Sequence, residues 1–406
     1  MTNAGTLVAT AGLGLSLALI ATGCSSSSSD APSPSPSPSV SATTVALSPD
    51  VKVELQQALE QVRKDFNTPG IQAGVWTDDG QWVGSSGVAK QGTDQPVTPA
   101  DHTRVGSITK TMTATVILQL IDEGKLSFDD VIDKYVPGMP NGDTATIKNL
   151  IEMQSGIPAY TGDTTVLNKY VADPTQAFTP QELVDSVKKQ PAMFAPGEQF
   201  FYSNTNFVLL GMVIEKVTGK SISDNFEGRL LTPLKMTETS VPGTSTDLPD
   251  PFLSGISEQT DPVGTVKNAT NWNPSFAFTA GEVISTLDDL HRWGVALGTG
   301  EGILPAETQQ MRVESVNTTV PPNTPQRSYG MGIVNTAGWL GHTGEIPGYN
   351  TVVNYQPQSR TTIVIMVNSD ITNGPATQPI APAVTAFENL AQIMTTGSPS
   401  ASPSSS

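Results

Sequence analysis

Strand-like segments occur near both ends of this 406-residue chain, and helical patterns fill most of its middle. The segments are rich in β-branched and aromatic residues and are bounded by turn residues. They cover residues 71–76, 81–88, 329–334, 351–355 and 361–367. Strands that flank a helical region in this way usually pair into one antiparallel sheet. We therefore predict an α+β fold with a sheet built from both chain ends, flanked by helices, and an inserted, mainly helical lobe.

Apolar residues at helical spacing predict the other elements. The expected helices cover residues 49–66, 107–124, 147–153, 180–189, 204–219, 221–231, 286–298 and 381–394. Residues 241–273 are rich in Pro, Gly, Thr and Asp, so we expect a loop there. A cleft between the sheet and the helical lobe is the expected place for a site.

The two ends of the chain have compositions of their own. Residues 1–24 form a small, apolar segment that ends at Cys24 and is typical of a lipoprotein signal, in which the thiol carries lipid. An ordinary secretory signal, or a short anchor with a stray thiol, is the alternative. Residues 25–47 are a Ser/Pro-rich linker, which we expect to be disordered, as is the tail 396–406. The globular domain would then span residues 48–395. We expect it to be exported and held as a lipoprotein at the outer face of the cell membrane or in the cell wall space, or otherwise to be secreted.

Composition excludes several kinds of partner. Cys24 is the only cysteine, so no internal disulfide and no cysteine-based metal cluster is expected. The formal net charge of −17, without a basic run, excludes nucleic acid as a partner. His102 and His291 lack the spacing of metal ligands, and we predict neither a metal nor a cofactor.

A hydroxyl and an amine share the first turn of the helix that begins near Ser107. Ser107 and Lys110 are three residues apart and therefore lie on one helix face. An amine that burial keeps uncharged can take the proton of a neighbouring hydroxyl, and the helix N-terminus favours negative charge developing on an attacked carbonyl. The pattern alone is weak, because Ser186 and Lys189 repeat it.

Two further motifs distinguish Ser107 from Ser186. Tyr202-Ser203-Asn204 precedes an apolar helix, and His342-Thr343-Gly344 lies between strand candidates. The order Ser-x-x-Lys, Tyr-x-Asn, His-Thr-Gly resembles the serine penicillin-recognising superfamily, and within it the class C β-lactamases and the Streptomyces-type D-alanyl-D-alanine carboxypeptidases. The likeness extends from about residue 51 to residue 394.

The resemblance implies an acyl-enzyme mechanism. Ser107 would attack a peptide, amide, ester or β-lactam carbonyl, and Lys110 and Tyr202 are the two candidate proton acceptors. Asn204 would hydrogen-bond the substrate amide or Lys110. His342 would donate to Tyr202 or to the leaving group, with a charge state adjustable near neutral pH.

The strand after His342 is expected to bind the substrate. Thr343, Gly344 and Glu345 would line the site, and the backbone N–H groups of Ser107 and Glu345 would form an oxyanion hole. Relatives usually carry Thr or Ser where Glu345 stands, and its carboxylate would repel an anionic substrate. No Lys or Arg occurs in residues 329–341, where a carboxypeptidase of this type is expected to hold the substrate carboxylate with Arg.

These observations predict an envelope serine hydrolase that forms an acyl-enzyme on Ser107, resembling a D-alanyl-D-alanine carboxypeptidase, a β-lactamase or an esterase. Its partners would be a small-molecule or peptide substrate, the peptidoglycan stem peptide among the candidates, and a membrane reached through lipid on Cys24. The alternative is a catalytically silent module of the same fold that binds cell-wall peptide or a protein.

Overall fold

The computed structural model describes residues 45–259, 265–375 and 379–396. The expected signal segment, Cys24, nearly all of the linker and the tail from residue 397 lie outside these residues. Within the described part, no helix is long and apolar enough to cross a membrane.

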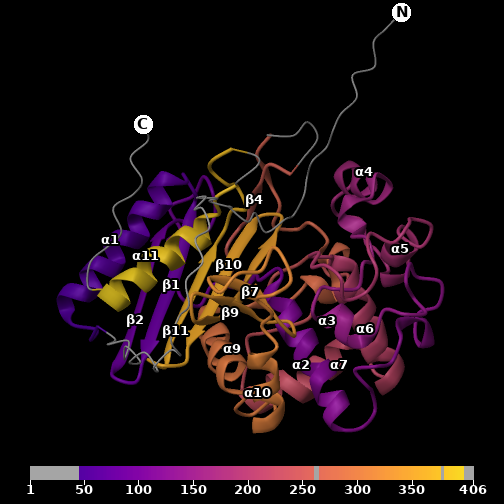
Figure 1. Ribbon diagram of the computed structural model, residues 1–406. Helices are drawn as coiled ribbons and strands as arrows, with labels where there is room; N and C mark the ends of the chain where they lie inside the picture. The colour runs from indigo at the N-terminus through magenta and orange to yellow at the C-terminus, as the bar shows by residue number, and fades with distance from the viewer. Residues whose placement is uncertain (1–44, 260–264, 376–378, 397–406) are drawn as a thin grey trace, which may run out of the picture.

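One seven-stranded antiparallel sheet forms the centre of the molecule (Figure 1). Its strands are β1 (Gly70–Thr77), β2 (Gly80–Gly87), β7 (Arg327–Tyr329), β8 (Val334–Thr336), β9 (Trp339–Ile346), β10 (Tyr349–Gln356) and β11 (Thr361–Val367). The strand order is β2-β1-β11-β10-β9-β8-β7. The first strand therefore pairs with the last, with Ile71 opposite Val367. This pairing confirms the predicted α+β fold with a sheet from both chain ends.

Helices cover both faces of this sheet. On one face, α1 (Pro49–Asp65) and α11 (Pro382–Thr396) lie side by side (Figure 1). Residues 363, 365 and 367 of β11 join the core under these two helices, whereas residues 364 and 366 join the core on the opposite face. Successive strand residues point to opposite faces of the sheet. Residues 363–367 of β11 are all apolar because both faces of this strand are buried.

The opposite face carries the helices next to the site. They include α2 (Ile108–Asp122), α9 (Leu287–Thr299) and α10 (Ala306–Glu314). The inserted lobe contains α3 (Ile147–Ile151), α4 (Thr164–Ala172), α5 (Pro180–Asp185), α6 (Asn204–Thr218), α7 (Ile222–Phe226), the π-helix η3 (Glu227–Leu231) and α8 (Thr232–Leu234). Short 3₁₀ turns are η1 (Ile132–Lys134), η2 (Tyr160–Gly162), η4 (Pro274–Phe276) and η5 (Phe278–Ala280). Figure 1 shows the lobe beside the sheet, with α2 between them.

Several predicted elements differ from the structure. The expected strand over residues 329–334 is two strands, β7 and β8, because the chain turns at Gly332, which has a φ of +62°. His342-Thr343-Gly344 lies within β9, which the glycines at 341 and 344 hid from a propensity argument. Helices α4 and α10 were not predicted, and residues 221–231 form α7 and a π-turn instead of one α-helix.

The remaining short strands fix the loops around the site. β3 (Thr103–Arg104) pairs with β6 (Ile284–Ser285) just before the Ser107 turn. β4 (Ile256–Ser257) and β5 (Lys267–Asn268) form a small hairpin within the expected loop over residues 241–273. Hydrogen bonds between residue 256 and residues 368 and 370 join this hairpin to the end of β11.

Candidate active site

Ser107 stands at the N-terminus of α2, directly after a turn that only glycine suits. Gly106 has a φ of +54°, and a Cβ added there would lie 2.5 Å from the backbone nitrogen of Glu345. One position before Glu345 in β9, a Cβ added to Gly344 would lie 2.0 Å from the carbonyl oxygen of Val105. Two glycines therefore let β9 approach the turn closely and place the backbone of Glu345 beside Ser107.

Lys110 is completely buried and lies against the Ser107 hydroxyl. Its Nζ is 2.8 Å from Ser107 Oγ and 2.6 Å from the carbonyl oxygen of Ala280. Burial lowers the pKa of Lys110 well below the ordinary value, because a charged ammonium is poorly solvated there. A neutral amine that donates to Ala280 keeps its lone pair for the Ser107 proton.

Tyr202 lies just before α6 and reaches the same place. Its half-buried ring is 5.0 Å from Nζ of Lys110, measured to the ring centroid. Desolvation raises the pKa of Tyr202, and the hydrogen bond with Ser107 opposes this rise only partly. Tyr202 is therefore a phenol rather than a phenolate near neutral pH. Of the two candidate bases, Lys110 is therefore the one whose basic form burial favours.

His342 is buried behind Tyr202 rather than poised in the pocket. Its ring lies 6.2 Å from that of Tyr202 and 5.8 Å from that of Tyr329, centroid to centroid. Burial is the main reason that the pKa of His342 is lowered to about 3. The expectation of an adjustable charge near neutral pH is thus not supported, because a buried imidazolium is poorly solvated.

The ring nitrogens of His342 have different surroundings. Nδ1 hydrogen-bonds to the carbonyl of Thr343, whereas Nε2 is buried without a hydrogen-bond partner among the described residues. Because the Thr343 carbonyl can only accept, Nδ1 carries the proton and Nε2 is an acceptor. This arrangement positions the ring, and His342 donates no hydrogen bond to Tyr202 here.

Asn204 also reaches the pocket. It is 8% exposed, and the neighbours of the Lys110 amine are Ser107 and Ala280 rather than Asn204. Of the two partners expected for Asn204, the structure therefore leaves the substrate. Thr343 and Gly344 contribute through the backbone of β9, since neither residue lines the pocket.

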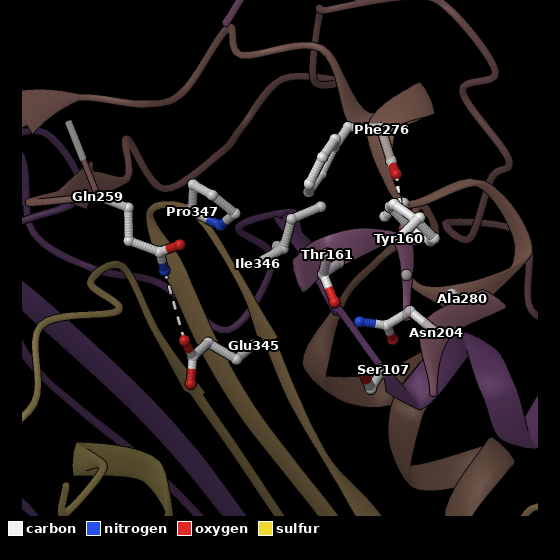
Figure 2. A pocket seen from close by; sticks show the side chains of 12 residues that line it. Ser107, Tyr160, Thr161, Asn204, Gln259, Phe276, Ala280, Glu345, Ile346 and Pro347 are labelled. Carbon is white, nitrogen blue, oxygen red and sulfur yellow. Dashed lines mark hydrogen bonds between the residues drawn. The ribbon is translucent and has the colours of Figure 1, made fainter. Parts of the chain in front are cut away.

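A pocket opens from Ser107 between β9 and the helical lobe (Figure 2). Its lining residues are Ser107, Tyr160, Thr161, Asn204, Gln259, Phe276, Ala277, Ala280, Gly281, Glu345, Ile346 and Pro347. The hydroxyl of Tyr160 donates to the carbonyl of Phe276 at 2.7 Å and so joins two walls of the pocket. Among the hydrogen bonds of the described residues, none uses the backbone N–H of Ser107, which leaves it available to an oxyanion.

The sequence interpretation missed two polar residues near Glu345. The side-chain amide of Gln259 donates to Asp370 Oδ2 at 2.6 Å and to Glu345 Oε1 at 3.4 Å. Burial and the charge of Asp370 raise the pKa of Glu345 to about 8, and burial raises that of Asp370 to about 7. No local motif marks Gln259 or Asp370, because they come from the β4 loop and the end of β11.

The second Ser-x-x-Lys pattern has no such surroundings. Helix α5 ends at Asp185, and Ser186 Oγ donates to the carbonyl of Leu183 at 2.7 Å. Lys189 is exposed. The hydroxyl is thus used locally, and Ser186 does not line the pocket that contains Ser107.

A positive charge lies near the site, just before the segment 329–341 that contains no Lys or Arg. Arg327, on β7, precedes residues 329–341 by two positions, and its charge partly opposes the rise that burial causes in the pKa of Tyr202. It does not line the pocket with Ser107. The described residues also contain no group of three or more His, Cys, Asp or Glu placed to hold a metal ion.

Known proteins share this architecture and a quarter to a third of the aligned sequence. The family model described as Beta-lactamase matches residues 55–382. A D-stereospecific amidohydrolase from Streptomyces sp. is 32% identical, with a TM-score of 0.74, over 86% of this chain and 99% of that chain. The D-amino acid amidase from Ochrobactrum anthropi SV3, solved with L-phenylalanine, is 25% identical, with a TM-score of 0.70, over 78% and 91% of the two chains.

A curated relative gives a similar match over a smaller share of its own length. Protein flp of Staphylococcus aureus (strain N315) is 27% identical over 332 residues, which are 79% of this chain and 64% of that protein. The chain therefore spans less than two thirds of that relative.

Proposed function

Because this chain belongs to the Beta-lactamase family of serine hydrolases, we propose that it hydrolyses small amides and esters through an acyl-enzyme on Ser107. The observation that carries the proposal is the 2.8 Å contact between Ser107 Oγ and the buried amine of Lys110. A nucleophile and a base at this distance, with the base uncharged, form the activated pair that acyl transfer needs.

In the proposed first step, Ser107 Oγ attacks the substrate carbonyl while Lys110 takes its proton. Backbone N–H groups of Ser107 and Glu345 stabilise the resulting oxyanion. The bond to the leaving amine or alkoxide then breaks, and that group receives the proton through Lys110 or the Tyr202 hydroxyl. Water finally attacks the Ser107 ester and releases the acid. His342 acts by positioning Tyr202.

We further propose amides of D-amino acids as the substrate class. The Streptomyces relative named as a D-stereospecific amidohydrolase supports this choice, since it aligns over nearly its whole length. The pocket also has no Lys or Arg in its lining. A substrate that ends in a carboxylate, such as a D-Ala-D-Ala peptide of peptidoglycan or a β-lactam, would therefore bind without a counter-ion.

A small substrate panel tests this proposal. D- and L-phenylalanine amide, a p-nitrophenyl ester, a chromogenic cephalosporin and a D-Ala-D-Ala peptide are offered to wild type and to Ser107→Ala. We expect wild type, but not Ser107→Ala, to hydrolyse the D-amide and the ester. In a second measurement, a fluorophosphonate should label wild type, and peptide mapping should locate the adduct on Ser107. Equal turnover by Ser107→Ala, or an adduct elsewhere, would contradict the mechanism.

The alternative of a silent binding module predicts another result. Such a protein would bind cell-wall peptide equally well with and without the Ser107 hydroxyl and would turn over nothing in the panel. Ester hydrolysis that disappears in a folded Ser107→Ala variant eliminates it.

We also propose that the hydrolase domain, residues 48–395, is exported and tethered by lipid on Cys24. The apolar segment before this lone cysteine supports the proposal. Mass spectrometry of the mature N-terminus tests it: a diacylglyceryl group on Cys24 is expected, and an unmodified N-terminus elsewhere would exclude it.

A further inference from the structure

The pocket has an acidic side opposite its aromatic side. Figure 2 shows Glu345 and Gln259 across the pocket from Tyr160, Thr161 and Asn204. Glu345 is the one Asp, Glu, Lys, Arg or His among the residues that line it. Any charge preference of the pocket for its substrate therefore depends on this carboxylate and on the groups behind it.

Asp370 shares a hydrogen-bond donor with Glu345. One amide donor, Nε2 of Gln259, lies within reach of both carboxylates, and Ser257 Oγ donates to Asp370 Oδ2 at 2.8 Å. Asp370 is 5% exposed, and its Oδ1 is buried without a hydrogen-bond partner in the described structure. Among the described residues, neither carboxylate has a Lys, Arg or His ion-pair partner.

Two adjacent carboxylates without a cation are costly to keep ionised. This agrees with the raised pKa of both groups, about 8 for Glu345 and about 7 for Asp370. A cation brought by the substrate would compensate the charge, whereas an anion would add to it. A primary ammonium suits the place, because its donors could bind the Glu345 carboxylate, which accepts one long hydrogen bond of 3.4 Å, from Gln259, among the described residues.

We propose that Glu345 determines specificity by receiving a primary ammonium group of the substrate whose carbonyl lies at Ser107, with Asp370 and Gln259 as positioning residues. Free amino-acid amides and esters fit this requirement, and N-acylated or anionic analogues do not. The inference rests on the proposed acyl transfer at Ser107, since that step fixes where the substrate carbonyl lies.

The test compares D-phenylalanine amide with N-acetyl-D-phenylalanine amide, which differ in the ammonium group. In wild type, kcat/KM should favour the free amide by about tenfold or more, as expected for a charged hydrogen bond. In Glu345→Gln this ratio should fall to near one. Asp370→Asn should lower it less, and Glu301→Gln, a matched change at an exposed turn residue, should leave it unchanged.

Calorimetric binding of the two amides to Ser107→Ala, with and without Glu345→Gln, separates this inference from the proposed function. Preferential binding of the free amide that requires Glu345, in a wild type that turns nothing over, would support the inference and contradict the proposed function. An equal preference in wild type and Glu345→Gln, by kinetics or by binding, would overturn the inference, as would tighter binding of the N-acetyl amide. If Glu345→Gln does not fold, an unchanged ratio in Asp370→Asn overturns it.

Discussion

At the scale of single residues, burial favours the basic form of only one of the two candidate proton acceptors. Lys110 and Tyr202 both lie close to Ser107, but desolvation acts on them in opposite senses. It disfavours the charged form of each, which is the acid of lysine and the base of tyrosine. The same burial that prepares Lys110 to accept a proton therefore keeps the proton on Tyr202.

Replacing Lys110 by Met should separate catalysis from stability. The variant keeps a similar volume and loses the base, so kcat should fall by about 10²–10⁴-fold. The melting temperature should not fall, because a buried amine without a carboxylate partner is replaced by an apolar group. Ester hydrolysis and thermal unfolding measure the two effects. Lys189→Met, from the second Ser-x-x-Lys pattern, is the control and should change neither.

His342 should remain neutral across the physiological range. Its pKa is lowered to about 3, so lowering the pH from 8 to 5 should not protonate its ring in the folded protein. The chain has three histidines, which makes nitrogen NMR of histidine-labelled protein a direct measurement. The His342 resonances, assigned with His342→Asn, should stay constant. A midpoint near pH 6.5 would show that the ring is solvated.

At the scale of elements, the site depends on how closely β9 approaches the turn before α2. Val105 hydrogen-bonds to Val283, which fixes one side of the turn, and β9 lies against the other. The two backbone N–H groups proposed to bind the oxyanion, those of Ser107 and Glu345, come one from each of these two elements. A shift of β9 by less than a side chain's width would therefore separate them.

Gly106→Ala tests this junction. The change combines an unfavourable φ of +54° with a Cβ 2.5 Å from Glu345 N, so we expect lost activity and destabilisation of more than about 2 kcal/mol. Gly124→Ala is the matched control, since Gly124 also has a positive φ of +67° but nothing within 4 Å of an added Cβ. It should cost about 1 kcal/mol and leave kcat unchanged. Equal effects in denaturant unfolding would contradict the close approach.

At the scale of the whole molecule, buried acids should make stability depend on pH. Glu282 is 1% exposed, its Oε2 has no partner among the described residues, and burial raises its pKa to about 8. The folded state therefore holds a proton that the unfolded chain releases near pH 4.3. This contribution to stability is complete below that pH and is lost as the pH rises through about 8.

Glu282→Gln should remove this loss. Its stability relative to wild type should increase from pH 5 to pH 8, by about 1.4 kcal/mol per pH unit at most. Thermal or urea unfolding at several pH values measures the difference, with Glu301→Gln as an exposed control that should follow wild type. A constant difference would mean that Glu282 has an ordinary pKa.

Much of the fold could be predicted from local patterns, because several helices and strands, including those near the two ends of the folded domain, have clear sequence signals. Helices α1 and α6 have the helical period, and strands β1, β2 and β11 are short strand-like runs bounded by turn residues. β9 was hidden by Gly341 and Gly344, since these positions are selected for close packing against Val353 and Val105 rather than for strand propensity.

The sequence by itself determined the order of the motifs and the candidate nucleophile, because Ser107 and Lys110 share one helical turn at any tertiary arrangement. The tertiary structure decided how burial and neighbouring groups shift the proton affinities of these side chains. Burial favours the neutral forms of Lys110 and His342, and the fold brings Gln259 and Asp370 to Glu345 from distant segments. Solvation and long-range contacts set proton affinity, and neither is encoded in local spacing.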